Sequence, residues 1–339
     1  MDRLESCIQT YTLTADEYRE CFPNEDEVSS WPVQCRVFEP DPRQNPGMGA
    51  RPILIRECFD QLECLIQSCH RNVLVVAGNK GVGKRTFLDY VFMKGMIMGD
   101  TYIVRHSQEK NGRPLTYLYY PGGVIMVSED SMPTITRILN NRGRSLEDIV
   151  VLCDTLPPNS LLQRFDGALV IATSSDPREV RKFQSTHKCT VAFTDIWDRW
   201  EVVQGVRAVL KIQTLSPRVG MVYKYWPFMH YYAHNTDMLT CSDSQFSHFV
   251  GKLETKLEKS FQTDHGMIMR ASKRLTDANC LGTDFVYEYA SPHVFNLMNT
   301  TIQTQGTQQL KVLLNFLLSM SRLSKPTRTM VHQKLSQLA

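Results

Sequence analysis

"VLVVAGNKGVGKRTF", residues 73–87, combines a strand-like apolar run, a glycine-rich loop and the start of a helix. The loop matches the pattern G-x-x-x-x-G-K through Gly78, Gly83 and Lys84. Glycines let the backbone curl so that successive N–H groups can surround phosphate oxygens. The following helix directs its positive end at the same anion, and Lys84 adds a full charge near the β- and γ-phosphates. This stretch therefore predicts a phosphate-binding loop between a buried strand and a helix.

The residues predicted to contact a nucleotide form one continuous run. They are Gly78, Asn79, Lys80, Gly81, Val82, Gly83, Lys84, Arg85 and Thr86. Arg85 stands where such loops place a Ser or Thr whose hydroxyl binds Mg²⁺, and a guanidinium cannot bind a cation. Thr86 comes one residue late, about 100° further around the helix. Nucleotide binding therefore tolerates this change better than hydrolysis does, and Arg85 is a candidate for neutralising phosphate charge directly.

A second apolar run, "DIVVLCD" at residues 148–154, ends in Asp154. A carboxylate at the end of such a strand holds Mg²⁺ in nucleotide sites of this kind. Asp154 is therefore the predicted metal ligand and, with Lys84, a predicted catalytic residue. A turn-forming role in "DTLPP" is the alternative. No Glu follows Asp154, so the common water-activating acid is missing at that position.

The next apolar run ends in "IATSSDP", residues 171–177. Thr173 or Ser174 is a candidate for placing a hydroxyl near the γ-phosphate, and simple turn formation is the alternative. Guanine recognition usually requires an N-K-x-D motif, and none follows the later strands. The sequence therefore predicts ATP as the nucleotide, with Mg²⁺ as its metal.

The strand candidates between residues 51 and 225 are apolar runs that alternate with helical spacing. Such runs are typical of a mostly parallel sheet covered by helices on both faces, so 51–225 is predicted to be an α/β P-loop NTPase domain. Residues 1–50 end in a Pro- and Gly-rich stretch, which predicts an irregular arm or linker. Residues 226–339 are predicted to be a helical C-terminal region. Within it, 310–323 are apolar on nearly every side and indicate a buried helix.

Composition limits the classes of protein that fit. The length of 339 residues suits two or three domains, and the net charge of +3 does not predict nucleic-acid binding. No apolar run approaches the length of a membrane span, and the N-terminus lacks the apolar core of a signal peptide. Ten cysteines without a C-x-x-C pair indicate buried, reduced thiols in an intracellular protein.

Five segments follow one another in a characteristic order. They are "RPILIRECFDQLECLI", "VLVVAGNKGVGKRTFLDYVF", "IVVLCDTLPP", "LVIATSSDPREVRKFQ" and "CTVAFTDIWDRWEVVQGV". Their order resembles the P-loop NTPase module of Crinkler effectors, secreted proteins of oomycetes and some fungi. The trypanosome retrotransposon-hot-spot proteins share that module. Phe87 and Asp154 fit the family's loop and acid, Asp176 with Pro177 fits its Ser-Pro, and Ile196 and Trp197 with Glu201 fit its aromatic segment.

The resemblance covers roughly residues 51–300 and contains two departures. Arg85 replaces the loop serine. In "RVGMVYKYW", residues 218–226, Gly220 is retained, but Tyr223 or Lys224 replaces the family's arginine. Both departures affect catalysis. The C-terminal nuclease or kinase-like signature that Crinklers often carry, and their Leu-x-Leu-Phe-Leu-Ala-Lys leader, are not found in the sequence.

Three functional hypotheses remain open at this stage. The first is an ATPase in a Crinkler-like virulence effector, with Lys84 holding phosphates and Asp154 holding Mg²⁺. The second is a catalytically inactive nucleotide-binding interaction module that acts on host proteins or nucleic acid, which Arg85 favours. The third is a nucleotide or small-molecule kinase, for which "RGRSLED" at 142–148 is too short to serve as an Arg-rich lid.

The resemblance also implies partners and a location. It implies a secreted effector that acts inside a host cell, commonly in the nucleus. The sequence contains no basic cluster that would direct it there, and without the resemblance an intracellular location is the expectation. A nucleoside triphosphate is the predicted ligand, no membrane partner is predicted, and the oligomeric state stays open.

Overall fold

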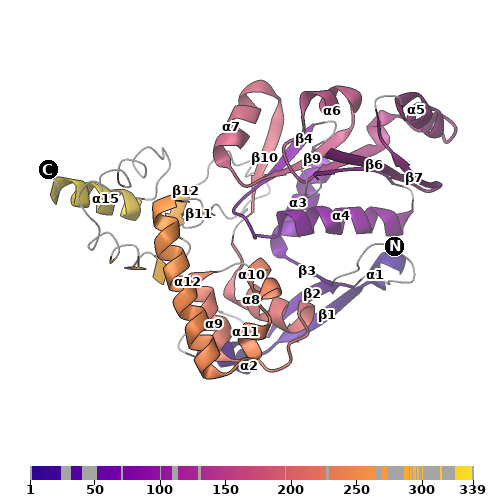
Figure 1. The fold of residues 1–339 in the computed structure, drawn as a ribbon. Coiled ribbons are helices and arrows are strands. Elements are labelled where there is room, and N and C mark those ends of the chain that lie inside the picture. The colour runs from indigo at the N-terminus through magenta and orange to yellow at the C-terminus, as the bar shows by residue number, and fades with distance from the viewer. Residues whose placement is uncertain are drawn as a thin grey trace.

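The protein is described by a computed structural model over residues 2–23, 32–39, 52–69, 72–99, 101–108, 114–128, 131–194, 196–226, 229–263, 269–272, 286–289, 291, 293–294, 296–297, 300, 314 and 325–337. A large sheet with helices on both faces forms the upper part of the molecule in Figure 1. A smaller layer of strands and helices lies below it, with strands from the N-terminal segment.

The central sheet has seven strands in the order β10-β4-β9-β8-β5-β6-β7. Its strands are β4 (Val73–Ala77), β5 (Tyr102–Gln108), β6 (Pro114–Tyr120), β7 (Gly123–Met126), β8 (Ile149–Cys153), β9 (Leu169–Ser174) and β10 (Cys189–Phe193). The pairs from β10 to β5 are parallel, whereas β6 and β7 are antiparallel additions at one edge. The prediction of an α/β fold with a mostly parallel sheet is confirmed.

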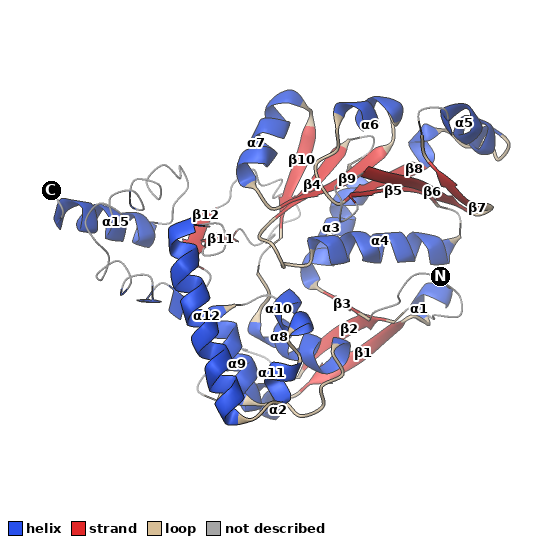
Figure 2. Ribbon diagram, in the orientation of Figure 1, coloured by secondary structure: helices blue, strands red, loops and turns tan. Residues whose placement is uncertain are grey.

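Helices cover both faces of this sheet (Figure 2). They are α3 (Glu57–Ser68) and α4 (Lys84–Met98) on one face, and α5 (Met132–Asn140), α6 (Asn159–Arg164) and α7 (Pro177–Thr186) on the other; a 3-10 turn η2 (Leu146–Asp148) precedes β8. Successive side chains of a strand point to opposite faces. Leu74 and Val76 of β4 therefore pack in the cluster with α3 and α4, whereas Val75 and Ala77 pack with α7. Burial on both faces explains the uninterrupted apolar run of β4.

The N-terminal segment differs from the irregular arm that was predicted for residues 1–50. It contains α1 (Asp2–Glu5), β1 (Ile8–Leu13), α2 (Ala15–Cys21) and β2 (Val33–Phe38). The two strands join β3 (Ile53–Ile55) in an antiparallel sheet with the order β1-β2-β3. Thr14 and Glu17 form a capping box at the start of α2. The prediction followed the Pro- and Gly-rich stretch at 40–51, which lies outside the described residues.

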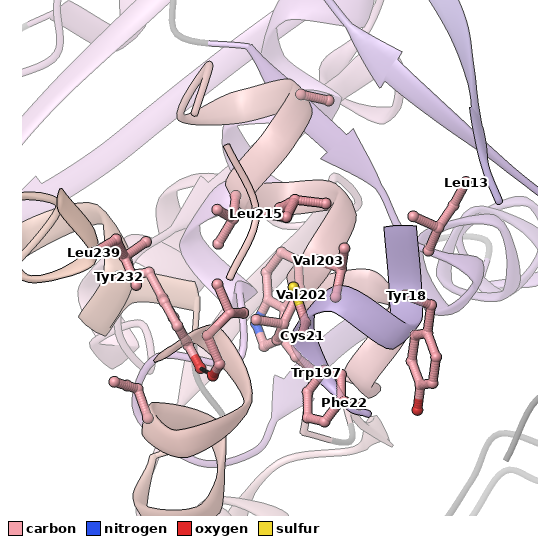
Figure 3. Close-up of a cluster of buried hydrophobic side chains, with 14 of the residues drawn as sticks. Leu13, Tyr18, Cys21, Phe22, Trp197, Val202, Val203, Leu215, Tyr232 and Leu239 are labelled. Atoms are coloured by element: carbon pink, nitrogen blue, oxygen red, sulfur yellow. Dashed lines mark hydrogen bonds between the residues drawn. The ribbon is translucent and has the colours of Figure 1, made fainter. Parts of the chain in front are cut away.

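A set of helices follows the central sheet and packs against this small sheet. It contains α8 (Arg199–Gln204), the π-helical turn η3 (Gly205–Val209), α9 (Pro217–Tyr225), α10 (Met229–His234), α11 (Asp237–Thr240) and α12 (Asp243–Thr263). Figure 3 shows their shared core, in which Leu13, Tyr18 and Phe22 of the N-terminal segment meet Val202 and Tyr232 of the later helices. Segments far apart in sequence therefore build one buried cluster.

The C-terminal part contains the hairpin of β11 (Met269–Ser272) and β12 (Val286–Tyr289) and the helix α15 (Lys325–Gln337). The predicted buried helix at 310–323 lies outside the described residues, apart from Leu314. In the described part of the chain, no helix combines the length and apolar character needed to cross a bilayer. The prediction of buried thiols is confirmed for Cys21, Cys35 and Cys153, and burial raises the pKa of each to about 12. It is wrong for Cys64, which is exposed.

Candidate functional site

The predicted loop lies at the carboxyl end of β4, beside β9, where the connections of the sheet diverge. Helix α4 follows β4 on one face of the sheet, and α7 follows β9 on the opposite face (Figure 1). In open α/β sheets, ligands bind outside the carboxyl ends of the strands at such a switch point. The fold therefore puts residues 78–83, which we call the glycine loop, at the expected position for a ligand site.

Gly78 allows the glycine loop to leave β4 in close contact with β10. Its φ angle is +150°, and a Cβ atom there would lie 2.6 Å from Thr194 Oγ1 and 2.7 Å from the Thr194 carbonyl oxygen. The Thr194 N–H in turn donates to the Ala77 carbonyl at 2.8 Å. A side chain at residue 78 would therefore force the loop away from β10.

The carbonyl oxygens of the glycine loop are bound by side chains of the protein. Those that accept such a bond belong to Gly78, Asn79, Gly81 and Val82. Their donors are Lys84 for the first two, at 2.8 and 2.7 Å, Trp197 for the third, at 3.3 Å, and Arg56 for the fourth, at 2.7 Å. These bonds turn the carbonyl groups toward the protein.

The N–H groups of the same loop are in the opposite situation. Those of Lys80, Gly81 and Gly83 have no acceptor among the described residues. The side-chain nitrogen of Asn79 is likewise buried without a partner in the described part of the chain. No side chain caps the start of α4. A cluster of unused donors at a helix N-terminus suits an anion with several oxygens.

Lys84 lies almost fully inside this cluster. The residue is 7% exposed, and desolvation lowers the pKa of its ammonium group to about 7. Within the described residues its acceptors are the two loop carbonyls, and no carboxylate neutralises it. Of the other predicted contacts, Val82 is buried, Lys80 is exposed, and Thr86 is half-buried. A buried ammonium group without a counter-ion suits an anionic ligand.

Arg56 and Glu201 hold the outer side of the glycine loop. Arg56 donates to Glu201 through Nε and Nη2, at 3.0 and 2.8 Å, and to the Val82 and Ile196 carbonyls. Its guanidinium also lies 4.5 Å from the ring centroid of Trp197. Among the sequence predictions, Glu201 appeared only through the resemblance, and Arg56 did not appear. The sequence signal that could have identified Arg56 is its position as a charged residue between the apolar strand at 53–55 and a helix.

Asp154 lies at the carboxyl edge as predicted, but its partners are arginines. Its Oδ2 accepts from Arg85 at 2.5 Å, and its Oδ1 accepts from Arg105 of β5 at 2.7 Å. Arg105 also donates to Asp89 of α4 at 2.9 Å. Magnesium needs oxygen ligands in near-octahedral geometry, and here a guanidinium binds each carboxylate oxygen. These contacts do not fit the magnesium ion that was predicted at Asp154.

The hydroxyl candidates on β9 have structural partners. Thr173 donates to the Asp154 carbonyl at 2.7 Å and so ties the ends of β8 and β9 together. Ser174 accepts from the Asp176 N–H at 3.2 Å, and the Asp176 side chain caps α7. The contacts of Ser174 agree with the turn-forming alternative.

The segment at 218–226 reaches the loop through Trp197. Tyr223 donates to the Trp197 carbonyl at 2.8 Å, and the Trp197 ring in turn contacts Gly81. Gly220 packs against the Cys21 backbone, where a Cβ atom would lie 2.1 Å from the carbonyl oxygen. Tyr223, which replaces the family's arginine in one alignment, is therefore connected to the glycine loop through Trp197.

The structure does not support a kinase lid at residues 142–148. Arg144 pairs with Asp148, and Ser145 caps η2. This turn precedes β8 and so lies at the amino ends of the parallel strands, whereas the glycine loop lies at their carboxyl ends. Over the described residues, no group of three His, Cys, Asp or Glu side chains could hold a metal ion.

The fold defines an α/β protein with a glycine-rich loop at the switch point of its sheet. No protein-family model matches the chain, and no curated protein is significantly similar to it. The chemistry of the site therefore has to come from the residues described above.

Proposed function

We propose that the chain is a nucleotide-binding module of the P-loop class that holds the phosphates of ATP in the glycine loop. The observation that carries this proposal is the division of the loop's hydrogen-bonding groups. Its carbonyl oxygens are bound by Lys84, Trp197 and Arg56, whereas N–H groups and the Asn79 amide are left without acceptors among the described residues. A ligand with many acceptor oxygens and negative charge complements this arrangement.

Lys84 supplies the charge in this proposal. Its ammonium group is buried and lacks a counter-ion in the described part of the chain. A bound phosphate would provide one, and Nζ would then exchange a loop carbonyl for a phosphate oxygen. Hydrogen bonds between charged partners contribute about 1.5–3 kcal/mol each, so Lys84 is the side chain with the largest expected share of the affinity.

The proposal extends to a Crinkler-like effector that acts inside a host cell, commonly the nucleus, as the resemblance implies. Support comes from the family's aromatic and acidic positions, because Trp197 and Glu201 contact the glycine loop or its supporting arginine. The segment at 189–206, through Trp197 and Glu201, and the segment at 51–66, through Arg56, therefore both hold this loop. A host protein or nucleic acid is the partner class in this proposal.

A second candidate function is nucleotide binding without turnover. Arg85 pairs with Asp154, the acid that would hold the metal of an ATPase. Thr86 is not among the partners of Asp154. A binding module in which ATP orders the loop or selects a partner needs neither Mg²⁺ nor a water-activating acid.

Calorimetric titration with ATP, together with phosphate release, tests these proposals. Lys84→Ala should weaken binding roughly ten- to a hundred-fold, since a charged hydrogen bond is lost. Lys94→Ala is the matched control, because Lys94 lies on the same helix and pairs with Glu63. Equal ATP affinity in wild type and Lys84→Ala would overturn the binding proposal. Binding with no phosphate release would select the second candidate.

A further inference from the structure

The region between the start of α4 and the end of β8 is where a P-loop ATPase would keep its metal ion. In this chain, two guanidinium groups converge there on one carboxylate. Arg85 Nη2 lies 2.5 Å from Asp154 Oδ2, and Arg105 Nη2 lies 2.7 Å from Oδ1. The three residues come from α4, β5 and the end of β8, so the sheet topology brings them together.

Arg105 occupies a fixed and largely enclosed position. Its side chain is 14% exposed and pairs with Asp89 as well as Asp154. Its Nη1 is buried and has no partner among the described residues. One nitrogen of a buried guanidinium is therefore unused, and an unpaired buried donor favours an acceptor that arrives with a ligand.

Arg85 differs from Arg105 in its exposure. Its side chain is 68% exposed and projects from the first turn of α4, next to Lys84. The Asp154 side chain is only 10% exposed, but it keeps Arg105 as a second partner, so the solvent-exposed Arg85 guanidinium can exchange this carboxylate for a phosphate oxygen. The groups that pair with one another are two arginines, Arg85 and Arg105, and two carboxylates, Asp89 and Asp154. Lys84, next to Arg85 in the chain, adds a positive charge below its pKa of about 7, so in that range the cluster is net positive before any metal binds.

A divalent cation at Asp154 would meet both arginines. It would have to displace two hydrogen bonds and then lie at contact distance from two positive charges. Coulomb repulsion falls only with the inverse of distance, so this arrangement disfavours the metal. The same two charges attract an unmetallated phosphate chain, which carries the negative charge that Mg²⁺ otherwise screens.

We propose that Arg85 and Arg105 take the place of Mg²⁺, so that this site binds a nucleoside triphosphate as the metal-free anion. Asp154 is a positioning residue that holds the two guanidinium groups until the phosphates arrive. This inference rests on the proposed nucleotide-binding function, and it specifies the ionic form of the ligand that the site selects.

The test is a titration of the full chain with ATP, once in excess EDTA and once in excess Mg²⁺. We expect ATP to bind at least about ten-fold more weakly in excess Mg²⁺ than in EDTA, because Mg²⁺ converts the metal-free anion to its magnesium complex. Equal binding in the two conditions, or tighter binding in Mg²⁺, would overturn the inference and leave the proposed function standing. No binding in either condition would overturn both.

Two variants sharpen the test. Arg85→Ser supplies the hydroxyl and frees one oxygen of Asp154, so Mg²⁺ should now raise the affinity by about ten-fold or more. Asp154→Asn removes a negative charge from the arginines, so ATP should bind equally well or better in both conditions. If Asp154 were a metal ligand, Asp154→Asn would instead weaken binding in Mg²⁺ alone, and that result would overturn the inference.

A control and a folding check keep these outcomes separable. Arg144→Ser removes the pair of Arg144 with Asp148, which lies at the amino end of β8, and should leave both titrations unchanged. Thermal unfolding of each variant shows whether the fold is retained. If Asp154→Asn unfolds, the comparison of wild type with Arg85→Ser still decides the inference. An Arg85→Ser variant that still binds ATP more weakly in Mg²⁺ than in EDTA, as expected for wild type, would count against it.

Discussion

Two arginine–carboxylate pairs flank the glycine loop, and they differ most in burial. The side chains of Arg56 and Glu201 are 3% and 4% exposed, whereas those of Arg85 and Asp154 are 68% and 10% exposed. The buried pair also holds the Val82 carbonyl, so it is part of the loop's framework. The other pair leaves its guanidinium in reach of solvent and ligand. One arginine therefore supports the backbone of the loop, and the other is the arginine that we propose to contact a ligand.

Breaking the buried pair should have the largest effect on stability. Glu201→Ala leaves the Arg56 guanidinium buried without its carboxylate, a change that typically costs about 3–5 kcal/mol. The variant also loses the capping box at the start of α8, in which the Asp198 N–H donates to Glu201 at 2.8 Å. Urea unfolding measures the free energy of unfolding directly.

An exposed pair of the same type is the control for this experiment. Arg36 and Asp60 have side chains 45% and 47% exposed. Asp60→Ala should change the free energy of unfolding by less than about 1 kcal/mol. Similar decreases in the free energy of unfolding for Glu201→Ala and Asp60→Ala would mean that burial does not make the Arg56–Glu201 pair more important for stability than the Arg36–Asp60 pair.

The entry of the glycine loop should be nearly as sensitive. Gly78→Ala puts a Cβ atom against backbone and side-chain atoms of Thr194 at a φ angle of +150°. Strain of this kind costs on the order of 1–3 kcal/mol, and ATP binding should weaken because the loop moves. Gly99→Ala is the matched control, with φ of +78° and no atom within 4 Å of the new Cβ. It should leave ATP binding unchanged, and an equal loss of affinity in both variants would contradict the role of Gly78.

The charge of Lys84 should make both stability and binding depend on pH. Its pKa is about 7 in the folded chain, against an ordinary value of 10.5. Between these values the unfolded chain binds more protons, so this residue makes the folded state more stable as pH rises from 7 to 10.5. Below pH 7 the ammonium group is charged in both states, so the folded state bears the full cost of burying that charge.

ATP binding should show the opposite dependence, because phosphates require the charged form of Lys84. Above pH 7, affinity should fall roughly ten-fold per pH unit, with uptake of about one proton on binding. Calorimetry at pH 8.0 in HEPES and in Tris, buffers of different ionisation enthalpy, measures that proton. Lys84→Arg, which stays charged throughout, is the matched variant. Equal proton uptake in wild type and Lys84→Arg would assign the effect to another group.

Sequence patterns predicted the parts of the site that depend on local order. The glycine spacing predicted the loop. The apolar runs predicted β4, β8 and β9, because strands buried on both faces of a sheet are apolar throughout. The partners of Asp154 were not predictable in this way, because Arg105 reaches it only when β5 pairs with β8. Arg56 and Glu201 are likewise separated by 145 residues. Charge pairs between distant segments leave no periodic signal in a single sequence.

The pair with the exposed arginine should give the smallest change in stability and a distinct change in chemistry. Arg85→Ser removes a guanidinium that is 68% exposed, and the largely buried Asp154 keeps Arg105 as its partner, so the free energy of unfolding should change by less than about 1 kcal/mol. The serine hydroxyl then faces a carboxylate with one free oxygen, since Arg105 still holds the other. Phosphate release, if it is slow in wild type, should rise and become Mg²⁺-dependent. Unchanged phosphate release with intact ATP binding would locate the obstacle elsewhere, first at Tyr223, which binds the Trp197 carbonyl beside the loop.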